Sequence, residues 1–544
     1  MSSTSSSSSE IIKNRFLGFL IWQLIYPTII YFIYKTLLSL FTYHFFSFSL
    51  FTPFFFLIFH SSILLFSYSL STISSPQVIP SASFTEISSS IVRFLINSVI
   101  GSRTPNVSTP SFRNGVRNSL GFVLFVISSA ISGLIAVVSL CRNSDLFDGF
   151  ELIGLGFRGF VFGLIYGVHY VYLKRWVLSF PIIQRPRFFS FKMGLPSSAR
   201  IALKLSSLSF FCSALVVVFL PDKYKSKGTI WKFIVEQVIF YIGSIAVSLC
   251  WELSHLLHEV LHTKRCIFAP PIGSAAAETN PSEPLLAALE ESTPKSLLQY
   301  LAYLDLCMTC ENNVDTWRRA AFFEETGETY RRVVSVCLRP LEQMTSKLCE
   351  GFEGSPTEKT DRFSRQLRSP TDMVNELKLD ESFNEFQLCE WSARAVSALT
   401  ARSHKDDRFG VAQLSGCNAS VMSTFLSCLL AVEACMGKKT HLQAPQLMGP
   451  TSIKWATLNT GKRDGATASV GKRRGGPLHG KAYAMADVLR TSIYMIVSVF
   501  HNEMMGSTKA GNLEKDWIVG TKPLYGTCDV LVQKLSLFLD FRAS

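Results

Sequence analysis

Long apolar segments separated by short polar breaks fill residues 16–257, and this block constrains the fold more than any other feature of the chain. A helix rises 1.5 Å per residue, so about 20 mostly apolar residues cross the roughly 30 Å hydrocarbon core of a bilayer. Six segments reach about this length, at residues 16–34, 50–70, 120–141, 150–173, 201–220 and 230–257. The sequence therefore predicts a membrane domain with six transmembrane helices.

Lys and Arg are distributed unevenly between the predicted spans. They are frequent before the first span, after the second and fourth spans, and directly after the sixth: Lys13, Arg15, Arg93, Arg103, Arg113, Arg117, Lys174, Arg175, Arg185, Arg187, Lys192, Arg200, Lys264 and Arg265. The opposite side has only Lys35, Arg142, Lys223, Lys225 and Lys227. Because positive residues concentrate in cytosolic loops, we expect both termini on the cytosolic or nucleoplasmic side.

The C-terminal half has the pattern of a separate helical domain. Residues 263–284 read as a linker, and apolar residues then recur at helical spacing in residues 285–311, 324–351, 381–402, 411–436, 478–505 and 530–541. The predicted organisation is a Ser-rich tail (1–15), a six-span domain (16–262), the linker (263–284) and a soluble α-helical domain (285–544). The predicted fold class is thus membrane α-helical, with six transmembrane helices followed by an α-helical cytosolic or nucleoplasmic C-terminal domain.

Charge and cysteine usage argue against nucleic-acid and cofactor binding. The net charge of +13 falls mainly in loops beside the spans and in the basic loop 461–476, a distribution that suits anionic lipid headgroups. This loop is not a phosphate-binding loop, because five residues separate Gly465 from Gly471 and Arg473 follows Lys472. The 13 Cys show no repeated ligand spacing. We expect no cofactor and no direct nucleic-acid partner.

One zinc-type motif occurs at the end of the sixth predicted span. His258, Glu259 and His262 form an H-E-x-x-H pattern, in which two His on one helix face can bind zinc and the Glu can activate a water molecule. Glu311 and Asp315 are distant candidates for a third ligand. A membrane-embedded zinc metalloprotease is therefore one alternative function, but a polar helix end at headgroup level is the favoured interpretation.

Charged residues within the spans suggest a second alternative, a small-solute transporter. Glu151, Arg158, His169, Glu236 and Glu252 lie in or at the ends of predicted spans, where ionisable groups are costly and often functional. A structural role near the interfaces is the favoured interpretation. Residues 91–100 form a short amphipathic segment that either lies on the membrane surface or packs on the helix bundle.

An apolar stripe runs along residues 478–505. Val488, Leu489, Ile493, Ile496 and Phe500 recur at steps of three and four and share one helix face with Met485 and Val499. Such a stripe faces either the core of its domain or a partner protein. The core is the favoured interpretation, and these five residues are the candidates for partner binding.

Segments of the C-terminal half resemble the Ndc-type transmembrane nucleoporins. They are SLLQYLAYLDL (296–306), VVSVCLRPLEQMTSKL (333–348), DRFGVAQL (407–414), VLRTSIYMIVSVF (488–500) and LSLFLDF (535–541). Six spans ahead of a helical region are also similar to that family's organisation.

The resemblance implies a function without catalysis. It implies a multi-pass protein of the nuclear envelope that anchors the nuclear pore complex in the pore membrane and supports its assembly and the transport of mRNA and proteins. It also implies other nucleoporins as partners, including the WD-repeat nucleoporin ALADIN and inner-ring linker nucleoporins, besides the lipid of the envelope. In some lineages the family has a further role in spindle pole insertion.

Overall fold

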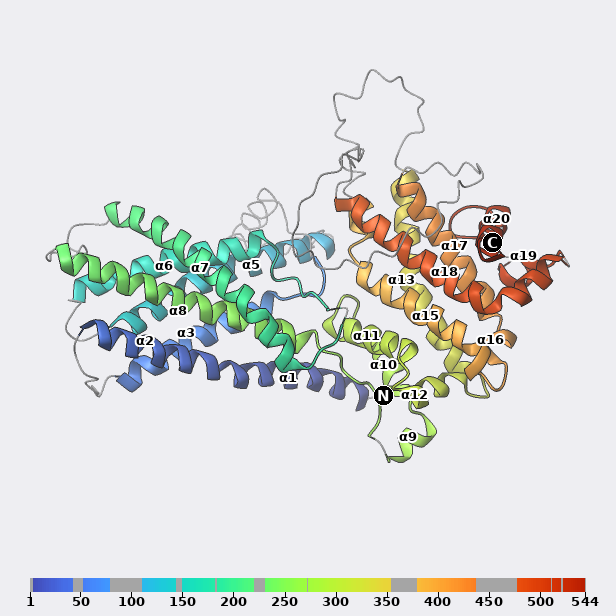
Figure 1. Cartoon of the computed structure of the whole chain (residues 1–544), viewed down its shortest axis with the longest axis horizontal. Coiled ribbons are helices and arrows are strands. Elements are labelled where there is room, and N and C mark those ends of the chain that lie inside the picture. Colours follow the sequence, from blue (N-terminus) through green and yellow to red (C-terminus); the bar gives the residue numbers. More distant parts are fainter. Residues whose placement is uncertain are drawn as a thin grey trace, which may run out of the picture. The chain divides into compact units, whose positions relative to one another are not determined.

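The computed structural model describes residues 3–42, 52–78, 110–142, 149–181, 183–219, 230–271, 273–353, 379–436, 477–509, 511–519 and 522–543. Within these ranges the chain is helical and contains no β-strand, apart from one isolated bridge between Ser75 and Val177. The chain divides into two compact units, which Figure 1 colours from blue to green and from green to red. The first comprises Met1–Cys266 with Thr293–Leu301, and the second comprises Ile267–Ser292 with Ala302–Ser544.

The first unit is a bundle of long helices around α8 (Figure 1). Its helices are α1 (Ser3–Gln23), α2 (Ile25–Thr42), α3 (Thr52–Ile73), α5 (Pro110–Cys141), α6 (Gly149–Tyr172), α7 (Arg187–Phe219) and α8 (Ile230–His262). α8 packs against each of the other six. At the centre of the bundle, the ring of Trp251 stacks on Phe66 at 4.9 Å and on Phe162 at 5.2 Å between centroids.

The outward faces of this bundle are apolar as well. Phe211 and Leu215 on α7 are each 67% exposed, and α1, α2, α5 and α6 also carry exposed Leu, Ile, Val and Phe side chains. A continuous apolar exterior is unfavourable in water and matches the hydrocarbon of a bilayer. The first unit therefore has the surface of a membrane domain.

Seven stretches of the described chain are long and apolar enough to cross a membrane. They are Glu10–Ser39, Pro53–Ile73, Gly115–Cys141, Leu152–Tyr172, Phe233–His262, Cys417–Cys435 and His479–Lys509. The first five correspond to five of the six predicted spans. The remaining predicted span, residues 201–220, falls in α7 and stays a prediction, because the side chains of residues 216–219 lie outside the described part.

The first span, predicted at residues 16–34, is divided between two helices in the structure. The helix is interrupted at Leu24, between α1 and α2, and α1 extends back to Ser3, so that it includes the Ser-rich stretch. Pro27 lies in the first turn of α2, where its missing N–H is tolerated but cannot continue the hydrogen bonds of α1. The side chain of Gln23, just before the break, donates to the carbonyl of Ile63 on α3 at 3.2 Å.

Glycines at every fourth position of α6 allow its backbone to approach α5 closely. A Cβ atom added to Gly159 would lie 2.7 Å from the carbonyl oxygen of Gly133, and one added to Gly163 would lie 2.8 Å from the Cα of Ala130. The hydroxyl of Ser129 donates to the carbonyl of Gly163 at 2.9 Å. This is the small-residue packing typical of membrane helices, and Gly167 continues the row.

Gly163→Leu is therefore expected to destabilise the bundle. The new side chain must displace the α5 backbone, and overpacking of this kind costs about 1–3 kcal/mol or more. Gly121→Leu is the matched control, because no atom lies within 4 Å of a Cβ at that position. Thermal unfolding of the purified full chain in detergent measures the difference. Equal unfolding temperatures for the two variants would contradict the close α5–α6 contact.

The second unit is built on four long helices that pack on one another: α13 (Glu328–Glu353), α15 (Phe386–Asp406), α17 (Cys417–Cys435) and α18 (Pro477–Lys509). Shorter helices complete it: α9 (Ala275–Thr279), α10 (Glu283–Glu291), α12 (Thr316–Ala320), η2 (Ala321–Phe323), α16 (Val411–Leu414), α19 (Leu513–Trp517) and α20 (Cys528–Ala543), together with the part of α11 (Leu297–Glu311) that follows Leu301. Each predicted helical segment contains helix where the structure describes it, but residues 324–327 and 383–385, at the start of two of the segments, are turns or irregular.

Two of these segments are divided rather than continuous. The predicted helix 285–311 is split between α10 and α11, because Pro294 lies in the connection. The predicted helix 411–436 is split between α16 and α17 at Gly416, whose φ of +68° is left-handed backbone that favours glycine. In contrast, α13 continues through Pro340 as one helix.

Candidate functional site

The C-terminal end of α8 is held by the side chain of Arg15 from α1. The guanidinium donates to the carbonyls of Leu261 and His262, both at 2.9 Å, and to the carbonyl of Lys264 at 2.7 Å. The last carbonyls of a helix have no partner within the helix and carry partial negative charge. Arg15 therefore supplies hydrogen-bond donors to the carbonyls at the end of α8, and its positive charge offsets their partial negative charge.

The two histidines of the H-E-x-x-H motif share their neighbours, whereas the glutamate has a different one. His258 and His262 are buried, stack on each other at 3.9 Å between ring centroids, and pack edge-on against Phe19 of α1. His262 Nδ1 is bonded to the carbonyl of His258 at 2.9 Å. The carboxylate of Glu259 instead accepts from the hydroxyl of Ser179.

The distant candidates for a third zinc ligand have arginine partners. The carboxylate of Glu311 accepts two hydrogen bonds from Arg394, each 2.7 Å long, and Asp315 lies 3.9 Å from Arg318. Within the described ranges, no cluster of three or more His, Cys, Asp or Glu side chains is suited to a metal ion. The geometry gives the zinc interpretation no support beyond the motif itself.

Of the charged residues in the spans, Glu252 lies in a buried hydrogen-bond network of the first unit. Its carboxylate accepts from Arg175 Nη1 at 2.7 Å and Nη2 at 2.6 Å, and from the Tyr166 hydroxyl at 2.8 Å. The Tyr170 hydroxyl joins the carbonyl of Arg175 to His255 Nδ1, both at 3.1 Å. This network fixes the chain after α6 against α8, which is a structural role.

The other span charges have different surroundings. The guanidinium of Arg158 lies 3.8 Å from the centre of the Phe240 ring and 5.8 Å from that of Phe210. His169 is partly buried on α6, Glu236 is buried on α8, and the side chain of Glu151 lies outside the described residues. Electrostatic interactions pair Arg158 with Glu236 and His169 with Glu252, and a transport site that unites the predicted residues stays a prediction.

The second unit contains a nearly completely buried ion pair that the sequence did not indicate. Arg318 donates to Asp305 at 2.7 and 3.2 Å, and their side chains are 3% and 0% exposed. Asp305 also accepts from the N–H of Phe268 at 2.9 Å, while Arg318 donates to the carbonyl of Phe268 and to the Thr309 hydroxyl, each at 3.1 Å. The pair therefore fixes the segment around Phe268 to α11 and α12.

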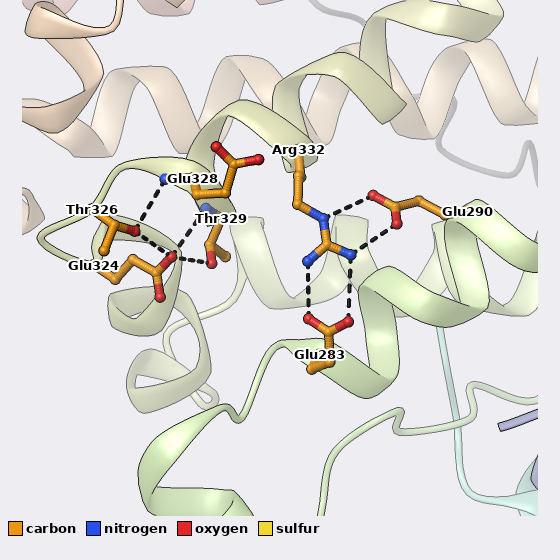
Figure 2. Close-up of polar contacts among 7 residues, drawn as sticks. All are labelled: Glu283, Glu290, Glu324, Thr326, Glu328, Thr329 and Arg332. Carbon is orange, nitrogen blue, oxygen red and sulfur yellow. Dashed lines mark hydrogen bonds and ion pairs between the residues drawn. The ribbon is translucent and has the colours of Figure 1, made fainter. Parts of the chain in front are cut away.

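A second, exposed cluster joins α10 to α13 (Figure 2). Arg332 of α13 bonds Glu290 at 2.8 and 3.0 Å and Glu283 at 2.9 and 3.4 Å. The hydrogen bonds from Arg332 lower the pKa of the Glu290 carboxyl. Beside it, Glu324 accepts from the Thr329 N–H at 3.1 Å and so satisfies the start of α13. Exposed pairs of this kind each contribute about 1 kcal/mol or less.

Apart from Val499, which is 38% exposed, the apolar stripe of α18 lies in the core of the second unit. Leu489, Ile493 and Ile496 are fully buried, Phe500 is nearly so, and Val488 is half-buried. α18 packs there against α15, α17 and α20. Partner binding through these five residues stays a prediction.

Two predicted features lie outside the described residues, namely the basic loop 461–476 and the amphipathic segment 91–100. The sequence analysis also missed two features of the structure. The glycine row of α6 has a readable signal, because Gly159, Gly163 and Gly167 repeat the G-x-x-x-G spacing of close membrane helices. The Asp305–Arg318 pair has no comparable signal, because neither its burial nor its pairing follows from local pattern.

The architecture defines the class of this chain as a multi-pass α-helical membrane protein. Residues 151–385 match the model of the protein family described as Nucleoporin protein Ndc1-Nup, which confirms the resemblance to the Ndc-type nucleoporins over this region. This is a family of structural proteins and not of enzymes. The matched region contains α6, α7, α8, the Asp305–Arg318 pair and the Arg332 cluster, and ends before α15. No curated protein matches the chain.

Proposed function

We propose that this chain anchors the nuclear pore complex in the pore membrane and supports its assembly and nucleocytoplasmic transport. The observation that carries the proposal is the extent of the nucleoporin match, which begins in the membrane helix α6 and continues into the helical second unit. An anchor needs both parts, one to hold lipid and one to hold soluble nucleoporins. The apolar exterior of the first unit supplies the lipid-facing part.

We further propose that the chain crosses the membrane six times and that α17 and α18 belong to a soluble domain. In α17, 72% of the most apolar stretch of the helix is buried within the protein. The corresponding share is 22–50% for the five candidate spans of the first unit. For α18 this share is 44%, but its apolar stripe faces neighbouring helices. Three ionic side chains also join α18 to α17 and α20. These are Arg490, Glu433 and Lys534, which pair at 2.8 and 2.9 Å.

Six crossings place both termini on the cytosolic or nucleoplasmic side, in agreement with the distribution of Lys and Arg. The partners of the second unit would be other nucleoporins, among them an ALADIN-like WD-repeat nucleoporin and inner-ring linker nucleoporins. Asn418 begins an Asn-Ala-Ser sequence, which is a glycosylation acceptor on the non-cytosolic side of a membrane. Glycosylation there is nevertheless a poor test of this orientation, because the Asn418 side chain is buried and lies 3.4 Å from the Tyr330 hydroxyl.

Antibody access to tags in selectively permeabilised cells tests location and orientation together. With only the plasma membrane permeabilised, tags at either terminus should stain the nuclear rim, because ends on the cytosolic side of the envelope are open to antibody. A tag inserted within residues 143–148, between the third and fourth spans, should stain only after the nuclear envelope is dissolved. Terminal tags that need full permeabilisation would contradict the orientation, and staining away from the rim would contradict the function.

A further inference from the structure

A cavity of about 450 Å³ lies in the first unit, where the loop after α6 and the first two turns of α7 meet the end of α8. Its lining combines exposed apolar side chains with cationic and hydroxyl groups, among them Ile183, Arg185, Ser190, Met193, Thr263 and Lys264. This volume is in the range of small-molecule sites in proteins, about 300–1,000 Å³. Neither the motifs in the sequence nor the anchoring function accounts for this cavity.

Hydrogen bonds hold the walls of the cavity in place. The Lys264 ammonium donates to the carbonyl of Arg185 at 2.9 Å, and the N–H of Arg265 donates to the side-chain oxygen of Gln184 at 3.1 Å. The Arg185 guanidinium crosses the rim to contact the sulfur of Met193. The loop is therefore fastened to the segment after α8, and a ligand would find the site already formed.

The charge of the cavity is positive. Arg185 and Lys264 line it, whereas Glu259, the carboxylate in the lining, already accepts from Ser179. Burial lowers the pKa of Lys264, and the positive charges of Arg187 and Arg265 lower it further. An anion in the cavity would relieve this repulsion between cations, and its hydrogen bonds to Arg and Lys would be charge-assisted.

With α8 crossing the membrane, the cavity would lie near the depth of lipid headgroups. The candidate span of α8 ends at His262, two residues before Lys264. Ile183 and Met193 are exposed at the rim, where acyl chains would begin. We propose that this cavity binds the phosphorylated headgroup of an anionic phospholipid. The proposal rests on α8 crossing the membrane and is independent of the nucleoporin role.

The test uses the full chain in phosphatidylcholine nanodiscs with a small amount of fluorescent phosphatidylinositol 4-phosphate as the probe. The double variant Arg185→Gln, Lys264→Gln removes two charges from the cavity. The control Lys192→Gln, Arg200→Gln removes two charges from the first half of α7, outside the cavity lining. Unfolding temperatures of all three proteins verify that the variants fold.

The cavity variant should weaken probe binding by at least about tenfold, since a hydrogen bond to a charged group is worth roughly a factor of ten. The control should weaken it by less than about threefold, because Lys192 and Arg200 do not line the cavity and would act only as surface charges. Equal weakening in both variants would show diffuse attraction to the membrane surface and overturn the proposal. Displacement of the probe by the water-soluble deacylated headgroup at equal concentration would also overturn it, in favour of a soluble phosphate site.

Discussion

Replacing Asp305 with Ala is expected to destabilise the second unit by about 3–5 kcal/mol. The substitution leaves the buried Arg318 guanidinium without its close carboxylate partner, with only Asp315 at 3.9 Å, and it removes the acceptor for the Phe268 N–H. A charge buried without a partner is far more costly than a lost exposed pair. The segment around Phe268 should detach from α11 and α12 before the four long helices separate.

Hydrogen exchange on the full chain in nanodiscs measures this effect locally, because each peptide reports its own opening free energy. Peptides from α11 and α12 should lose protection in Asp305→Ala. The control is Arg332→Ala, which removes the exposed bonds of Figure 2 to Glu283 and Glu290 and should cost about 1 kcal/mol or less. Equal loss of protection in the two variants would contradict the importance assigned to burial.

Ile493→Asp is expected to be the second severe substitution. The side chain is fully buried in the stripe of α18, so the new carboxylate would lose its hydration without gaining a partner. The cost should reach several kcal/mol, about 3 or more. Thr491→Asp, on the exposed side of the same helix, places the same charge in water and should change stability by about 0.5 kcal/mol.

Two measurements on the Ile493→Asp protein separate core from interface. Its protease resistance in nanodiscs reports the fold, and co-purification from cells reports nucleoporin binding. Loss of the fold is expected, whereas a folded protein that loses its nucleoporins would make the stripe an interface. A folded protein that keeps them would contradict both interpretations of the stripe. Membrane insertion should persist in every case, because it depends on the hydrophobicity of the spans.

The elements of the fold that depend on local pattern could be predicted from the sequence. An apolar segment of about 20 residues has few alternatives to a membrane helix, so five of the predicted spans agree with candidate spans of the structure. The breaks were harder to place. Pro27 and Pro294 are visible in the sequence, but whether a proline interrupts a helix depends on its position in the turn, as the continuous α13 around Pro340 shows.

The candidate sites depended more on tertiary contacts. The spacing of His258 and His262 suggested a metal site, but their packing on Phe19 from α1 could not be deduced from α8 alone. The cavity around Lys264 likewise combines a loop and two helices that are up to about 80 residues apart in sequence, as the bond from Lys264 to Arg185 illustrates. Only the α6 glycine row was readable in advance.

Proximity labelling with the full-length protein tests the central claim most directly. A labelling enzyme fused to the C-terminus should modify nucleoporins as its nearest neighbours, because the proposed function places the second unit at the pore. The same enzyme fused to an unrelated multi-pass protein of the endoplasmic reticulum provides the background. Enrichment of nucleoporins over that background is the predicted result. Labelling of general endoplasmic reticulum or plasma-membrane proteins without nucleoporins would contradict the anchoring function.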